Sequence, residues 1–148
     1  VRGNMIYTDT VKLLRECDAG IKMGISSIGD VLSHIHADDL RCCLSNCMAK
    51  HEELEKEIEK SLNSYDDEGK KPNPMAKGMS WIKTNAKLAM DNSDAAVADL
   101  MTDGCNMGVK SLCKYLNQYK AADERSKSIA KRLIELEEKL TIDMRTFL

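Results

Sequence analysis

A glycine-punctuated segment occurs twice in this chain and constrains its fold more than any other feature. Residues 18–32 read DAGIKMGISSIGDVL, and residues 103–116 read DGCNMGVKSLCKYL. An offset of 84 positions aligns Gly20 with Gly104, Met23 with Met107, Gly24 with Gly108, Ile25 with Val109, Ser27 with Ser111, Ile28 with Leu112 and Leu32 with Leu116. Widening the offset by two residues aligns the segments that follow, so that His51 coincides with Glu137 and Leu54 with Leu140. The chain therefore reads as one helical hairpin written twice, with a crossover between the copies.

Apolar or small residues recur every three or four positions in four segments, which predicts four helices. The segments run from Met5 to about His36, from about Leu40 to Leu62, from about Asp94 to Tyr119 and from about Asp123 to the C-terminus. We expect HADD, residues 36–39, to form the first turn and to supply an acidic cap, and Ser93 to start the third helix. Aromatic residues make up only 4% of the chain and charged residues 31%, a composition typical of long helices. The predicted fold class is all-α.

A chain of 148 residues is expected to form one domain with a core of its own. Residues 1–4 precede the first methionine and are expected to be an expression remnant, which leaves residues 5–148 as the domain. We divide it into a first hairpin (5–66), a crossover (67–92) and a second hairpin (93–148). Pro72 and Pro74 predict an exposed loop within the crossover, followed by a short helix that Trp81 anchors to the bundle.

Glycine inside a helix costs about 1 kcal/mol relative to alanine, so two glycines four residues apart, in both copies, need a physical reason. Gly20 and Gly24 share one face of the first helix, as Gly104 and Gly108 do in the third. We expect these faces to meet, so that the first and third helices touch almost backbone to backbone at the bundle centre. The alternative is that the glycines mark a kink or lie on the surface.

Two hairpins joined by a long crossover resemble the ferritin-like superfamily, and in particular its small rubrerythrin-like members. The resemblance covers the chain from about Met5 onward, and rests on topology and on the small-residue pattern. It implies a four-helix bundle in which two helices each contribute a glutamate, and the other two each a Glu-x-x-His motif, to a pair of metal ions. This sequence contains no Glu-x-x-His, and Ile21 and Cys105 stand about where the glutamates would be. A di-iron oxidase is therefore not expected.

The other carboxylates of the first and third helices are expected to lie on solvated faces, away from the apolar stripes. They are Glu16, Asp18, Asp30, Asp99 and Asp103. The six cysteines are expected to be reduced thiols that mostly pack as small apolar residues, since the chain looks cytoplasmic. They are Cys17, Cys42, Cys43, Cys47, Cys105 and Cys113.

A metal site that includes His51 is an alternative interpretation of the second helix. It lies on the apolar stripe of the second helix, four and eight residues after Cys47 and Cys43. A buried histidine that is hydrogen-bonded to Glu137 would satisfy both groups without metal, and we prefer this interpretation. The same residues, Cys43, Cys47, His51 and Glu137, are plausible ligands for zinc or copper.

Charge and hydropathy limit the classes of partner. The 22 basic and 24 acidic residues give a net charge of −2, without the basic patch that binds nucleic acid or anionic membranes. No apolar run is long enough to span a membrane. We expect a cytoplasmic, non-enzymatic structural or interaction module that needs no cofactor and associates with a second copy or a protein partner. The alternatives are a metal-storing or metal-sensing bundle, and a degenerate oxidase with one metal at His51 and Glu137.

Overall fold

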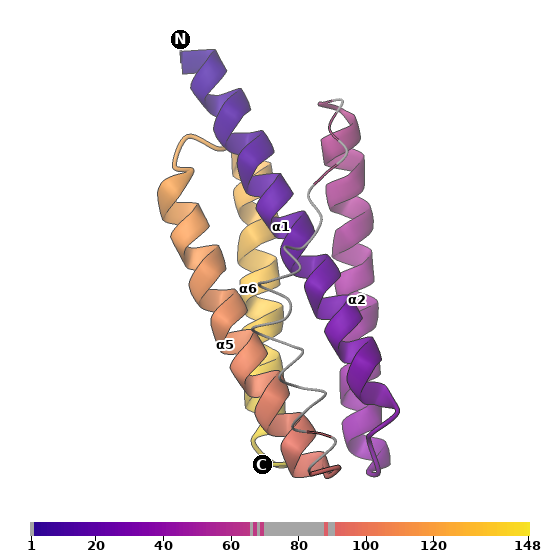
Figure 1. Ribbon diagram of the computed structural model, residues 1–148. Helices are drawn as coiled ribbons and strands as arrows, with labels where there is room; N and C mark the ends of the chain where they lie inside the picture. Colours follow the sequence, from indigo (N-terminus) through magenta and orange to yellow (C-terminus); the bar gives the residue numbers. More distant parts are fainter. Residues whose placement is uncertain (1, 66, 68, 70–87, 89–90) are drawn as a thin grey trace.

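Four long helices lie alongside one another and account for most of the chain (Figure 1). The computed structural model describes residues 2–65, 67, 69, 88 and 91–148. The helices are α1 (Arg2–Leu32), α2 (Asp38–Asn63), α5 (Asp94–Gln118) and α6 (Glu124–Met144). The described residues contain no strand, which confirms the predicted all-α class. The expected loop at Pro72 and Pro74 and the anchoring role of Trp81 lie outside the described residues.

Helix α5 starts with the predicted Ser93 cap, and α6 starts with a cap at Asp123, which was predicted only as the approximate start of that helix. The Ser93 hydroxyl accepts from the backbone N–H of Ala96 at 3.1 Å, and the Asp123 carboxylate accepts from Ser126 N–H at 2.8 Å. Both side chains satisfy donors that a helix N-terminus otherwise leaves without an intrahelical partner.

The prediction was wrong in detail at the first turn. Helix α1 ends at Leu32 rather than near His36, and the residue that caps α2 is Ala37, which makes no side-chain cap. The reason is a contact with the other hairpin. The carboxylate of Asp94, at the start of α5, accepts from the backbone N–H groups of His36 and Ala37 at 2.8 and 2.9 Å. Asp38 and Asp39 lie in the first turn of α2, where a negative charge favours the helix dipole.

The helix directions follow from Figure 1. Helices α1 and α6 run the same way along the bundle, and α2 and α5 run the opposite way. Helix α2 therefore ends at one end of the molecule and α5 begins at the other (Figure 1). The α1–α2 and α5–α6 connections, residues 33–37 and 119–123, are short turns.

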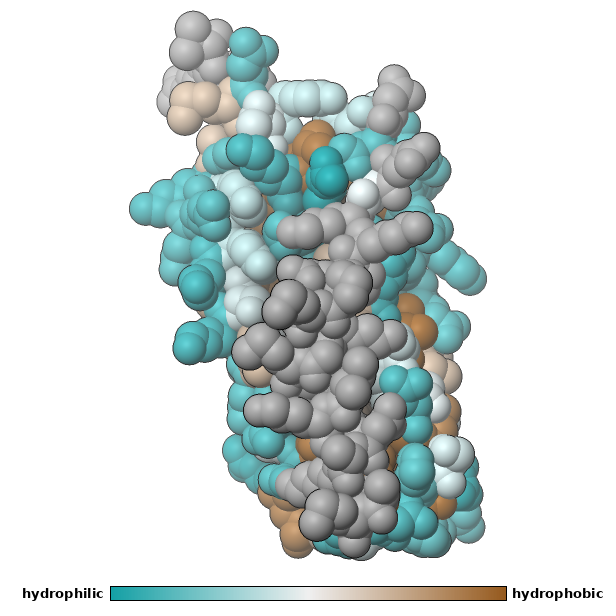
Figure 2. Space-filling model, in the orientation of Figure 1, coloured by the Kyte–Doolittle hydropathy of each residue, from teal (hydrophilic) through white to brown (hydrophobic). Residues whose placement is uncertain are grey.

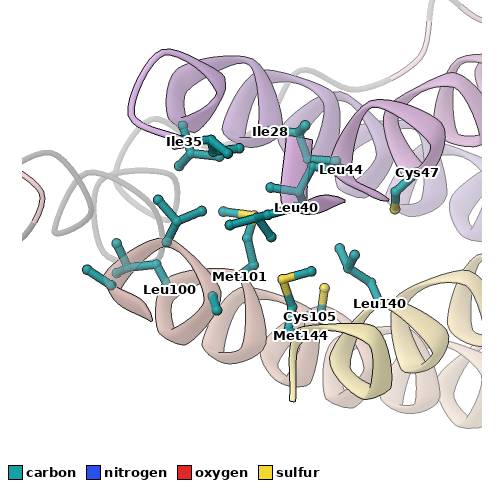
Figure 3. Packing of buried hydrophobic residues seen from close by; sticks show 14 of the residues in the cluster. Ile28, Ile35, Leu40, Leu44, Cys47, Leu100, Met101, Cys105, Leu140 and Met144 are labelled. Carbon is teal, nitrogen blue, oxygen red and sulfur yellow. The ribbon is translucent and has the colours of Figure 1, made fainter. Parts of the chain in front are cut away.

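Side chains from all four helices form two apolar clusters, one toward each end of the bundle. The first holds Ile28, Val31, Leu40, Leu44, Cys47, Met101, Cys105, Leu140 and Met144 among others. Figure 3 shows how its members from the two hairpins meet face to face. The second cluster holds Leu13, Leu14, Cys17, Ile21, Leu54, Ile58, Leu112, Ile129 and Leu133 among others. On the face shown in Figure 2, hydrophilic residues cover most of the coloured outer sides of the bundle.

Between the two clusters lies a set of four residues, one from each helix, that we call the central layer. It consists of Gly24, His51, Gly108 and Glu137. In sequence, each lies between a residue of one cluster and a residue of the other on the same helix. The central layer thus places two buried ionisable side chains, His51 and Glu137, at the middle of the bundle.

Candidate functional site

His51 is fixed by its own helix. Its side chain is 2% exposed, and its Nδ1 lies 2.8 Å from the backbone carbonyl oxygen of Cys47. Because a carbonyl oxygen only accepts, Nδ1 carries the hydrogen and donates, which leaves the lone pair on Nε2. Burial lowers the pKa of His51 from its ordinary value, against the opposing effect of the bond to the Cys47 carbonyl. The imidazole is therefore neutral at neutral pH.

Gly24 provides the space that the histidine ring occupies. A Cβ atom at this position would lie 3.0 Å from both Cδ2 and Nε2 of His51, closer than a methyl group normally approaches an aromatic ring. The nearest neighbours of Gly24 are thus side-chain atoms of α2. The expected close approach of α1 and α5 at this glycine stays a prediction. Among the described residues, no atom lies within 4 Å of a Cβ atom built on Gly20.

The second hairpin contains a matching arrangement around Glu137. This side chain is 7% exposed, and a Cβ atom on Gly108 would lie 2.5 Å from its Oε2 and 2.9 Å from its Oε1. Oε2 is buried without a hydrogen-bond partner. Burial raises the pKa of Glu137 to about 8, so the group is largely protonated and uncharged at neutral pH.

The expected hydrogen bond between His51 and Glu137 is absent from the structure. The donor of His51 is directed to the Cys47 carbonyl, and Oε2 of Glu137 has no partner among the described atoms. Each polar side chain instead packs against a glycine of the neighbouring helix in its own hairpin. The alignment placed the two residues at equivalent sites, and sequence alone did not show that each faces its own hairpin.

The thiols fall into three groups by their exposure to solvent. Cys17, Cys47 and Cys105 are buried, Cys43 is half-buried, and Cys42 and Cys113 are exposed. Burial raises the pKa values of Cys17 and Cys47 to about 12 and raises that of Cys105 as well, with smaller contributions from nearby acidic groups and thiols. In the described part of the chain, no three His, Cys, Asp or Glu side chains gather closely enough to hold a metal ion together.

Sequence reasoning placed one carboxylate on the wrong side of its helix. Asp18 is 1% exposed, although it was expected on a solvated face, whereas Asp30 and Asp103 are exposed as predicted. Lys22 Nζ lies 2.8 Å from Asp18 Oδ2 and 3.9 Å from Oε1 of Glu55 on α2. The four-residue spacing of Asp18 and Lys22 was the signal that could have revealed this ion pair. Glu55 was not singled out by any pattern.

No protein-family model, curated protein or solved structure matches the chain. In the described residues, no helix combines the length and the apolar character needed to cross a membrane. Function must therefore be argued from the geometry of the central layer and of the surfaces around it.

Proposed function

We propose that this chain is a ferritin-like bundle built from a duplicated hairpin, and that it acts as a non-catalytic structural or interaction module without a di-iron site. The partner would be another protein or a second copy of the chain, in the cytoplasm. The nearly balanced charge, 22 basic against 24 acidic residues, favours such partners over nucleic acid.

Two pairs of equivalent contacts support the duplication. The offset of 84 aligns Gly24 with Gly108, and the offset of 86 aligns His51 with Glu137, so the two glycine contacts of the central layer are equivalent. The same two offsets relate Thr10 to Asp94 and Ala37 to Asp123. Thr10 Oγ1 accepts from Asp123 N–H at 2.8 Å, as Asp94 accepts from Ala37 N–H at 2.9 Å. Shared helical periodicity alone would not reproduce these particular contacts between helices.

The non-catalytic part of the proposal rests on the hydrogen bonding and protonation of His51 and Glu137 in the central layer. Nδ1 of His51 is held by a carbonyl of its own helix, and Glu137 is largely protonated at neutral pH. Iron binding at Glu137 would therefore require the carboxyl to lose this proton. Ile21 and Cys105, at the positions that the family resemblance assigns to glutamates, are both buried and provide no carboxylate.

Aerobic oxidation of Fe(II) tests this proposal. Purified protein is mixed with two equivalents of Fe(II), and ferric absorbance is followed against a buffer blank. We expect the same rate with and without protein, and also with a Glu137→Gln variant. A rate increase that saturates near two irons per chain and disappears in Glu137→Gln would refute the proposal.

The alternative function is a metal-storing or metal-sensing bundle that uses Cys43, Cys47 and His51. The Nδ1 donor of His51 is occupied by the Cys47 carbonyl, and the Nε2 edge of the ring packs against Gly24. A zinc site that includes this histidine would therefore require the ring to turn and its hydrogen bond to break. A core histidine that binds no metal is therefore the simpler interpretation of His51.

A further inference from the structure

A groove of about 330 Å³ lies on the side of the bundle between α2 and α6. It is lined by Cys43, Cys47 and Lys50 of α2 and by Leu136, Lys139 and Asp143 of α6, with other residues between them. Two thiols from a single helix thus border one solvent-connected hollow. The central layer lies deeper in the bundle, and none of its four residues lines this groove.

Cys43 and Cys47 lie on one face of α2, and both line the groove. Residues four apart on a helix lie on the same face, with Cβ atoms about 5–6 Å apart. Among the charged and titratable groups around Cys47, Cys43 contributes most to the raised pKa of Cys47 after burial itself. Cys47 is buried and Cys43 is half-buried, so Cys43 is the more accessible of the two thiols. Figure 3 shows the side chain of Cys47 on the inner side of α2.

The Asp143 carboxylate lies beside Cys43 but is not a third ligand for an ion at the two thiols. Its Sγ lies 3.8 Å from Oδ2 of Asp143, to which the S–H donates a weak hydrogen bond. The same Asp143 oxygen is 2.8 Å from Nζ of Lys139, so its charge is already compensated. Nδ1 of His51 lies 3.6 Å from Cys47 Sγ, but it carries the hydrogen that it donates to the Cys47 carbonyl and so directs no lone pair at the sulfur. Among the described residues no third His, Cys, Asp or Glu completes a group around the thiols that could hold an ion.

The number of available ligands selects the ion. Zinc is almost always four-coordinate in structural sites, which two thiols do not satisfy. Soft thiolate ligands favour Cu(I), and Cu(I) is stable with only two sulfur ligands arranged linearly. We infer that Cys43 and Cys47 form a two-coordinate site for Cu(I) in the groove between α2 and α6.

Binding is an exchange of protons for a metal ion without electron transfer. The two S–H protons leave to solvent, two Cu–S bonds form, and copper remains Cu(I) throughout. The site is independent of the proposed function, because a bundle without a di-iron centre can bind Cu(I) whether or not it also acts as an interaction module.

An anaerobic competition titration of the reduced full chain with a chromogenic Cu(I) chelator tests the site. We expect one Cu(I) to be held tightly per chain. Cys43→Ser and Cys47→Ser should each weaken binding by more than the ~10–100-fold that loss of a residue orienting a metal ligand costs. Cys42→Ser and Cys113→Ser are matched controls, since both thiols are exposed, and should leave the affinity unchanged. Cys43→Ser changes a half-buried residue, so this arm remains informative even if the buried Cys47→Ser variant is unstable.

Three results would overturn the inference. The first is an affinity that Cys43→Ser leaves unchanged. The second is a loss in Cys42→Ser as large as in Cys43→Ser, which would indicate adventitious binding by surface thiols. The third is an X-ray absorption spectrum of the copper-loaded protein that shows more than two ligands or a nitrogen ligand, which would indicate a different site.

Discussion

Gly24 and Gly20 lie one turn apart on the same helix but have opposite environments. A side chain at Gly24 would meet the His51 ring, whose Nδ1 is held by the Cys47 carbonyl, whereas Gly20 has open space around its Cβ position. One glycine is therefore required by packing, and the other only lowers the helix propensity of α1.

These environments predict opposite effects of the same substitution. Gly20→Ala should stabilise the protein by about 0.4–1 kcal/mol, because alanine loses less conformational entropy on folding. Gly24→Ala should cost about 1–3 kcal/mol, because the methyl group overpacks the central layer. Urea unfolding of both variants measures the difference. Equal stabilisation by both would show that His51 is not confined by Gly24.

Glu55 faces Asp18 across the α1–α2 interface, with Lys22 as their shared cation. Burial and the neighbouring Asp18 carboxylate raise the pKa of Glu55 to about 8 from 4.5, despite the opposing charge of Lys22. The folded chain therefore retains a proton that the unfolded chain releases between these two values.

The direction of the pH dependence follows from this shift. The contribution of Glu55 to stability is fully present below about pH 4.5 and is lost as the pH rises through about 8. Urea unfolding at several pH values across this window should show a shallower decline for Glu55→Gln than for the wild type. Glu137 titrates in the same direction, so a residual slope is expected. The exposed Glu52→Gln is the control and should leave the slope unchanged.

At the scale of the helices, each hairpin turn is held by the other hairpin. Asp94 accepts from the N–H groups of His36 and Ala37 in the α1–α2 turn. Conversely, Asp9 accepts from Ala121 N–H at 3.0 Å and Thr10 accepts from Asp123 N–H at 2.8 Å, both in the connection between α5 and α6. These bonds tie the two hairpins together at opposite ends of the bundle.

Removing these acceptors should destabilise the protein without changing its fold. Asp94→Ala leaves two backbone N–H donors without their acceptor, and Thr10→Val leaves one. Each lost hydrogen bond should lower the free energy of unfolding by about 1 kcal/mol or more. Because the two sites lie at opposite ends, their effects should add in the double variant. Thermal or urea unfolding measures all three, with the exposed Asp103→Ala as control. A double variant no less stable than Asp94→Ala alone would contradict the independence of the two ties.

Local pattern predicted the helices well because their apolar faces and caps are encoded within a few residues. The end of α5 near Tyr119, the cap at Ser93 and the start of α6 at about Asp123 follow directly from such signals. The end of α1 did not, because Asp94 fixes the turn from a site far along the chain. No local pattern records a contact of that kind.

The burial of His51 and Glu137 could be predicted from the sequence, but the contacts of their side chains could not. Periodicity identified His51, and the internal alignment identified Glu137 as its counterpart; both are buried. The direction in which each side chain points depends on small rotations of neighbouring helices. For that reason the sequence suggested a His51–Glu137 bond, where the structure has two separate contacts with glycines.

At the scale of the whole molecule, the depth of each thiol predicts its reactivity. Cys42 and Cys113 are exposed, whereas Cys17, Cys47 and Cys105 are buried and have raised pKa values. Since the thiolate is the reactive form, the buried thiols should resist Ellman's reagent until the bundle unfolds. We expect Cys42 and Cys113 to react in native buffer, and Cys43 more slowly. Rapid native labelling of Cys17 or Cys105, located by peptide mass spectrometry, would contradict the packing.

The reciprocal ties at the two ends of the bundle bear on how the chain folds. Neither turn reaches its final hydrogen bonding until the opposite hairpin has docked, so a single hairpin is an incomplete folding unit. The molecule should consequently unfold in one cooperative step. In native-state hydrogen exchange, the amides of His36, Ala37, Ala121 and Asp123 should open with the same free energy, although they lie in different hairpins. Two separate opening energies would instead identify the hairpins as autonomous foldons.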